Sequence, residues 1–140
     1  EQAGEKFTEL DLSSNDKLNS LGLEGLRGLK QLKMPETDNL KEIVVKETAL
    51  ESLALEKYTK LDKVCVGGNQ FNTLKINMEQ KTEKDIENMY LLFDNNLKVE
   101  FISSKSGIVP NIKRLDNHNL WAGIVFSNYV VTDYEIPECW

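Results

Sequence analysis

The sequence predicts an α+β chain in which a short β-solenoid of parallel strands, two per turn, is followed by a C-terminal α+β cap. Three observations support this: a repeated apolar pattern up to Ile76, a change in side-chain type near Asn77, and a helix-start signal at Thr82. Of the 19 leucines, 14 precede residue 77, whereas eight of the 11 aromatic residues lie from there onward. We therefore expect a solenoid over residues 1–77 and a capping subdomain over residues 78–140.

The repeat consists of an apolar residue, two variable residues, a second apolar residue, a variable residue and a third apolar residue. It occurs seven times, and its central residue advances by 10 or 11 positions from copy to copy. The copies are Phe7/Leu10/Leu12, Leu18/Leu21/Leu23, Leu29/Leu32/Met34, Leu40/Ile43/Val45, Leu50/Leu53/Leu55, Leu61/Val64/Val66 and Phe71/Leu74/Ile76. Such a period indicates a repeat architecture in which each unit buries its apolar face against its neighbours.

Each copy is expected to form a strand. Its last two apolar residues alternate with an outward residue, which is the period of a strand with one buried face. About ten residues per copy, interrupted by Gly, Asn, Asp and Pro, are too few for an amphipathic helix. Two copies then make one coil of about 21 residues. We expect Leu10, Leu32, Leu53 and Leu74 to stack in one parallel sheet, and Leu21, Ile43 and Val64 to stack in the opposite sheet.

The turns between strands carry a polar column. Five residues after the central apolar position, four of six copies have Asn or Thr, at Asn15, Thr37, Thr48 and Asn69, whereas Leu26 and Tyr58 occupy the other two. Asn and Thr side chains both donate and accept hydrogen bonds, so they can satisfy the free backbone groups of a tight turn. A partial Asn/Thr ladder is the expected result.

The pattern stops at Ile76, and the second half begins with a different signal. Thr82 is a suitable N-cap, with acidic residues in the turn that follows. Ile86, Met89, Tyr90 and Phe93 fall on one helical face, which predicts a helix over 82–94. The β-branched and aromatic runs at 97–102, 121–127 and 129–136 predict strands. Since a solenoid exposes an apolar layer at its ends, we interpret this half as a cap.

Two stretches resemble a known family. Residues 7–15 (FTELDLSSN) and 61–76 (LDKVCVGGNQFNTLKI) are similar to the leucine-rich repeats of bacterial surface and secreted proteins. The variant of about 21 residues, LxxLxLxxNxL, found in gut Bacteroidetes and Gram-positive surface proteins, fits best over residues 5–77. The resemblance implies a solenoid, an extracellular or cell-surface location, and binding of protein or glycan partners by outward strand residues.

The outward residues of the first predicted sheet are the candidate partner-binding face. They are Glu9, Asp11, Ser13, Gln31, Lys33, Ser52, Glu56, Thr73 and Lys75, with Ala54 among them. The alternative is a solvated surface without a partner. Four strands about 4.8 Å apart and roughly 15 Å long expose on the order of 200 Å², whereas a standard interface needs roughly 800 Å² per partner.

The second predicted sheet has a less polar outer face. It includes Val44 and Cys65, and either the C-terminal half covers it or a partner does. We expect cover from the chain's own second half, because the chain that leaves Ile76 must pack somewhere. Cys65 and Cys139 are the two cysteines of the sequence, and they either pair in an oxidising compartment or remain free thiols.

Composition argues against several functions. A net charge of −6, from 17 Lys and Arg against 23 Asp and Glu, leaves no basic patch for nucleic acid or an anionic membrane. No apolar run is long enough to cross a bilayer. The single histidine, His118, lies in the turn-like run 116–119, and the sequence lacks a nucleophile-elbow or phosphate-loop motif.

No cofactor or metal is predicted either. The Asp and Asn residues at 94–96 and 116–119 do not follow the ligand order of a calcium loop. The sequence thus favours a non-enzymatic, extracytoplasmic binding module for a protein or glycan. The alternative is a structural spacer that presents a neighbouring domain.

Overall fold

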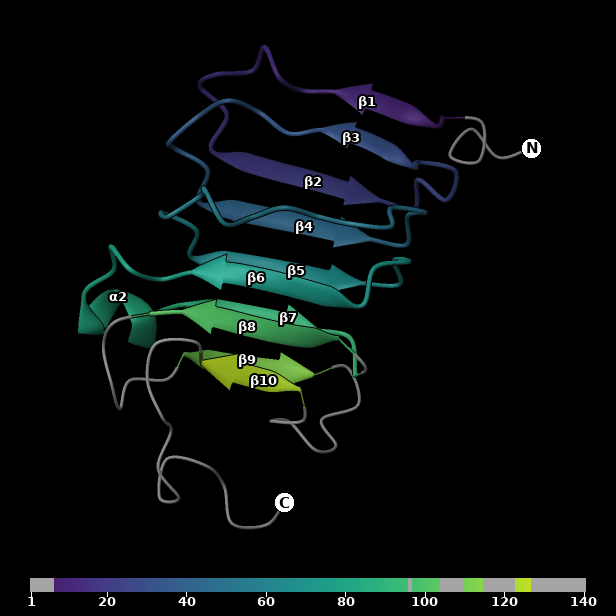
Figure 1. Cartoon of the computed structure of the whole chain (residues 1–140). Helices are drawn as coiled ribbons and strands as arrows, with labels where there is room; N and C mark the ends of the chain where they lie inside the picture. The colour runs from purple at the N-terminus through teal and green to yellow at the C-terminus, as the bar shows by residue number, and fades with distance from the viewer. Residues whose placement is uncertain (1–6, 96, 104–109, 115–122, 127–140) are drawn as a thin grey trace.

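The computed structural model describes residues 7–95, 97–103, 110–114 and 123–126. They form a parallel β-solenoid of about five turns with almost no helix, with coils stacked along one axis (Figure 1). The first side of the solenoid carries β1 (Glu9–Asp11), β3 (Gln31–Lys33), β6 (Thr73–Asn77), β8 (Lys98–Ile102) and β10 (Ile124–Phe126). The second side carries β2 (Ser20–Glu24), β4 (Glu42–Lys46), β5 (Lys63–Gly67), β7 (Tyr90–Phe93) and β9 (Asn111–Arg114).

The second side is one parallel sheet in the order β2-β4-β5-β7-β9. Its register places Leu21, Ile43 and Val64 in one column, which confirms the sequence prediction. Leu91 and Ile112 continue this column into the core. A second inward column, two residues further along each strand, consists of Leu23, Val45, Val66, Phe93 and Arg114. The ladder therefore continues beyond residue 77.

The first side has two separate ladders. β1 pairs with β3, so that Leu10 lies beside Leu32 as predicted. Further along the axis, β6, β8 and β10 form a three-stranded sheet in which Leu74, Val99 and Ile124 make the inward column. All of these pairs are parallel, which is the arrangement expected of successive coils of one solenoid.

Residues 51–55 interrupt the first side, and we call them the seam. Ala49 N donates to Leu29 O at 3.0 Å, and Phe71 N donates to Leu50 O at 3.0 Å, which places the seam between β3 and β6. The prediction that Leu53 lies in a continuous four-stranded sheet is wrong, because the seam forms no strand. β3 ends two residues before Pro35, which has no N–H for a ladder and restricts the residue before it.

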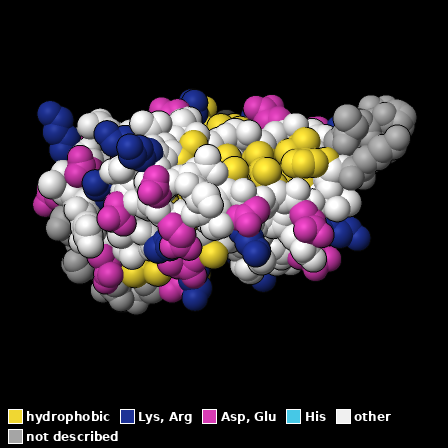
Figure 2. All heavy atoms as spheres, turned by 90° about the horizontal axis from the view of Figure 1, so that it is seen from above, with side chains coloured by type: hydrophobic (Ala, Val, Ile, Leu, Met, Phe, Trp, Pro, Cys, Tyr) yellow, Lys and Arg dark blue, Asp and Glu magenta, His cyan; other side chains and the backbone are white. Residues whose placement is uncertain are grey.

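The inward side chains form one core along the whole solenoid. Leu53 is buried in it although the seam is not a strand, and Phe101 stacks on Phe126 with ring centroids 5.3 Å apart. At the β1 end, no coil of the described residues covers the last apolar layer. Figure 2 shows apolar side chains gathered at this end, and Phe7 there is 40% exposed. The end of a stack of coils presents such an apolar layer.

The predicted polar ladder is confirmed for one pair of turns. Asn69 Oδ1 accepts from Thr48 N at 3.2 Å and from Thr48 Oγ1 at 2.6 Å, and Asn69 Nδ2 donates to Val45 O at 2.9 Å. In the same column Tyr58 is buried, and its hydroxyl donates to Pro35 O at 2.7 Å. Asn15, by contrast, is exposed.

Asn69→Ala is expected to lower the free energy of unfolding by about 1–3 kcal/mol, because Thr48 N and Val45 O lose their partner at a partly buried turn. Urea unfolding followed by circular dichroism measures the change. Asn39→Ala is the control: Asn39 is an exposed loop residue that takes part in the Thr37 turn through its backbone N–H, which the variant keeps. We expect it to change stability by less than about 0.5 kcal/mol. Equal changes in the two variants would contradict a stabilising ladder.

The predicted helix over 82–94 is largely wrong. Thr82 does cap a helix: Asp85 N donates to Thr82 Oγ1 and Thr82 N donates to an Asp85 carboxylate oxygen, both at 3.1 Å. The helix, α2, extends only over Glu83–Glu87. Residues 90–93 instead form β7, because the free edge of β5 offers a parallel ladder in which Leu91 and Phe93 enter the core.

The α+β cap is likewise not confirmed, since the described residues beyond 77 are mostly strand. The strand expected at 97–102 is present as β8. The strand expected at 121–127 is represented by β10, and the one expected at 129–136 lies outside the described residues. β9 does not correspond to any strand expected from the sequence. No helix in the described ranges is long and apolar enough to cross a membrane.

Candidate functional site

The candidate partner-binding residues lie on the outer face of the first side. Strand alternation directs them outward: Glu9 and Asp11 on β1, Gln31 and Lys33 on β3, and Thr73 and Lys75 on β6. Ser52 and Glu56 extend from the seam and the residue after it, and Ser13 follows β1. Eight of the nine are exposed, and Ser13 is half-buried.

Two adjoining grooves lie on this face, on either side of the seam. The larger, of about 570 Å³, extends from the seam across β6 and β8 to Val125 of β10. The other, of about 550 Å³, lies between the seam and β3. Ala54 and Glu56 line both grooves, so the seam is their common floor.

The grooves bring together six of the nine predicted residues. These are Ser13, Lys33, Ser52, Glu56, Thr73 and Lys75. Glu9, Asp11 and Gln31 lie outside the grooves. The sequence analysis missed Lys98, Glu100 and Val125, which line the larger groove from β8 and β10. The signal that could have found them is the alternation at 98–102, where Val99 and Phe101 point inward.

Most backbone groups of the seam lack a hydrogen-bond partner among the described residues, although Leu55 O accepts from Tyr58 N at 3.1 Å. In the described part of the chain, no hydrogen bond joins residues 51–55 to β3 or β6. Of the three exposed side chains of the seam, Ser52 and Ala54 are small, whereas Glu51 is a longer acidic side chain that also lines the larger groove. Backbone N–H and C=O groups that lack a protein partner must be satisfied by water or by a ligand.

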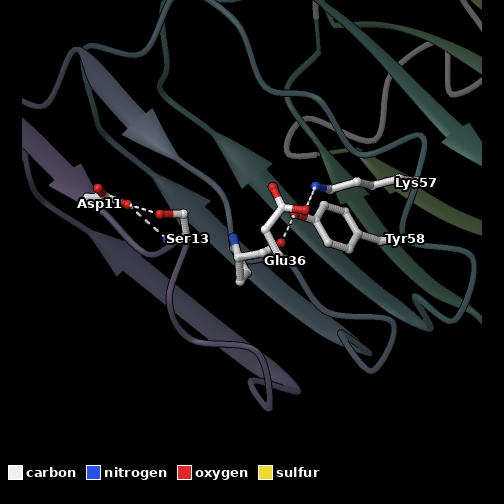
Figure 3. Close-up of polar contacts among 6 residues, drawn as sticks. Asp11, Ser13, Glu36, Lys57 and Tyr58 are labelled. Atoms are coloured by element: carbon white, nitrogen blue, oxygen red, sulfur yellow. Dashed lines mark hydrogen bonds and ion pairs between the residues drawn. The ribbon is translucent and has the colours of Figure 1, made fainter.

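Charged side chains surround the seam. Lys57 Nζ lies 3.2 Å from Glu36 Oε1, and this hydrogen bond raises the pKa of Lys57 (Figure 3). The Ser13 hydroxyl and N–H both donate to the Asp11 carboxylate, which lowers the pKa of Asp11 (Figure 3). The Lys57–Glu36 pair is exposed, so it contributes little to stability.

The other candidate sites offer less. Asp94 Oδ2 accepts a hydrogen bond from Gly68 N at 2.8 Å, so this carboxylate already has a structural role. No group of three or more metal-binding side chains occurs within the described ranges. His118 and Cys139 lie outside the described residues. Cys65 is a free, buried thiol, and burial raises its pKa.

The cover that the sequence predicts for the outer face of the second side stays a prediction, because much of the C-terminal half lies outside the described residues. Val44 and Leu92, which flank Cys65 in the ladder, are half-buried. The grooves of the first side therefore remain the better site, since they combine hydroxyls, ammonium groups and carboxylates with apolar side chains. Such a set can hold a partner by hydrogen bonds, ionic contacts and packing.

Comparisons of the chain with models of protein families, with curated proteins and with solved structures give no match.

Proposed function

We propose that this chain is a non-enzymatic, extracytoplasmic binding module of a bacterial surface or secreted protein. One observation carries the proposal: six residues predicted from the repeat pattern line two adjoining grooves on one outer face. In this proposal the solenoid is of the leucine-rich-repeat kind. The alignment of LxxLxL copies into coils and the Thr48–Asn69 bonds support that assignment. The extracytoplasmic location rests on the resemblance.

A protein is the preferred partner. The described lining of the two grooves contains no aromatic side chain on which a sugar ring could stack. The face is also larger than the repeat alone suggests. Six positions from β1 to β10, about 4.8 Å apart and roughly 15 Å long, give on the order of 400 Å². A partner that reaches the flanking turns approaches the roughly 800 Å² of a standard interface.

The test is a protein and glycan array probed with the purified chain and with Lys33→Glu/Lys75→Glu. We expect protein partners, and we expect the double variant to weaken their binding at least tenfold, because it reverses two charges in the grooves. Both lysines are exposed, so the free energy of unfolding should change by less than about 0.5 kcal/mol. Titration calorimetry and urea unfolding measure the two effects.

Lys41→Glu/Lys60→Glu is the matched control. It makes the same change in net charge at exposed residues outside both grooves. We expect it to leave binding within twofold of the parent chain. Equal loss in both double variants would show that total charge, rather than this face, governs binding. If Lys33→Glu/Lys75→Glu unfolds the chain, the outward assignment is wrong.

A spacer is the second candidate, and one observation favours it. β1 lies at one end of the stack and β9 and β10 at the other (Figure 1), so the described coils form a rod that can separate two attached domains. The same array distinguishes the two functions. No protein or glycan partner at high concentration would contradict the binding module and support the spacer.

A further inference from the structure

We propose that the seam holds a carboxylate of an acidic segment of the partner protein, placed over Ala54 between Lys33 and Lys75. This inference rests on the proposed function, because it names the chemistry of the partner at the same grooves. It follows from the order of charges across the face, from the absence of ion pairs at the two lysines within the described residues, and from the space above Ala54.

The strand register gives the order of charges. Lys33 lies beside Asp11 of β1, and Lys75 lies beside Glu100 of β8. Each lysine therefore has an acidic neighbour on the side away from the seam. On the side toward the seam, both lysines face Ala54, which lines the same grooves as they do. Ala54 thus stands between the two lysines, at the position where an acidic residue would continue the alternation of acidic and basic residues across the face.

Neither lysine is neutralised by a direct ion pair. In the described part of the chain, the ion pairs within 4 Å involve Arg27, Lys57 and Lys81, and not Lys33 or Lys75. Glu51 and Glu56, on either side of Ala54 in the sequence, line the larger groove with Lys75, and neither forms an ion pair with Lys33 or Lys75 within 4 Å. Charges further away are screened over about 8 Å at physiological salt. The net charge of −6 of the whole chain therefore does not determine the sign of the electrostatic potential at Ala54.

The space favours a polypeptide over a small free anion. The two grooves meet at Ala54 and have about 570 and 550 Å³, far more than one carboxylate fills. Met34 lines one groove and Val125 the other, and Val125 is 55% exposed. A segment that crosses the strands can place an acidic side chain between the lysines and pack its neighbouring residues on these apolar side chains. The seam backbone groups that lack a partner among the described residues offer it hydrogen bonds.

The first test places a carboxylate at the site within the chain itself. In Ala54→Glu, the introduced carboxylate should titrate at least about 0.5 pH unit below the usual value of about 4.3, because two ammonium groups stabilise its charged form. NMR of the side-chain carbon measures the pKa. Adding Lys33→Met and Lys75→Met should return it toward the usual value. A pKa shift caused only by changed packing would remain after both lysines are replaced.

Gly22→Glu is the control for the NMR measurement. Gly22 is an exposed outward residue of β2, its ladder neighbour is Val44, and no neighbouring atom lies within 4 Å of the position that a Cβ would take. We expect no downward shift of the carboxylate pKa there. Equal pKa values at positions 54 and 22 would overturn the proposed anion site.

The second test uses two labelled peptides, one alternating Glu and Gly and the other alternating Gln and Gly. The Glu peptide should bind at least tenfold more tightly than the Gln peptide, weaken as salt rises, and lose its advantage in Ala54→Glu. Equal binding of the two peptides overturns the acidic partner, whereas protein partners on the array would still support the binding module. An array without a protein partner instead contradicts the proposed function, and this inference with it.

Discussion

Phe93→Ala is expected to lower the free energy of unfolding by about 3–5 kcal/mol. Phe93 is fully buried in β7, between Val66 of β5 and Arg114 of β9 in the inward column. Its removal leaves a cavity in the middle of the core and takes an aromatic ring from the guanidinium of Arg114, whose Cζ lies 6.0 Å from the ring centroid. Urea unfolding followed by circular dichroism measures the loss.

Tyr90→Ala is the matched control, because it removes an aromatic ring from the other face of the same strand. Tyr90 is 38% exposed, and its ring centroid lies 5.8 Å from Lys113 Nζ. We expect a change below about 1 kcal/mol. Similar losses in the two variants would contradict the strand alternation of β7 and favour the helix that the sequence predicts there.

Arg114→Ala is expected to cost about 2–5 kcal/mol. Arg114 is 3% exposed, and its Nη1 donates to the backbone carbonyls of Asp94 and, at 2.9 Å, Leu97. Burial lowers its pKa, but an arginine stays charged in proteins. The variant leaves these carbonyls without their charged donor and opens a cavity beneath Phe93. Urea unfolding measures this loss as well.

Two further variants separate the causes of this loss. Arg114→Met keeps most of the side-chain volume, so we expect it to recover part of the packing while the carbonyls remain without a donor. Lys113→Ala changes the outward neighbour on β9 and should cost less than about 1 kcal/mol. A cost below about 1 kcal/mol for Arg114→Ala would show that the hydrogen bonds of this guanidinium to Asp94 O and Leu97 O contribute little to stability.

Much of the second side could be predicted from the sequence. The columns through Leu21, Ile43 and Val64 follow from a regular advance of 10 or 11 residues and from strand alternation. The cap at Thr82 could also be predicted, because it depends on residues three apart in the sequence. Both features depend on the spacing of residues along the chain, so the sequence alone is enough to predict them.

The strands beyond residue 77 could not be predicted in the same way. The insertion that contains α2 breaks the repeat, so the central residue moves 17 positions from Leu74 to Leu91. Residues 86–93 then match helical spacing as well as strand spacing. The edge of β5 favours the strand, because residues 90–93 form a parallel ladder with β5 and bury one face there. β9 was not predicted because Arg114, a charged residue, occupies an inward position, where the pattern of a half-buried strand has an apolar residue.

Period and polarity alternation are local properties, so the amino-acid sequence was sufficient to define the coil and the inward columns of the second side as far as Val66. Only the folded chain shows that β6, β8 and β10 share a ladder. It also shows that the seam at 51–55 lies outside both ladders of the first side. Pairing depends on which strand edges meet after the chain has wound through a full coil. The grooves exist for the same reason, since the seam, β3 and the later strands become neighbours only in the stacked solenoid.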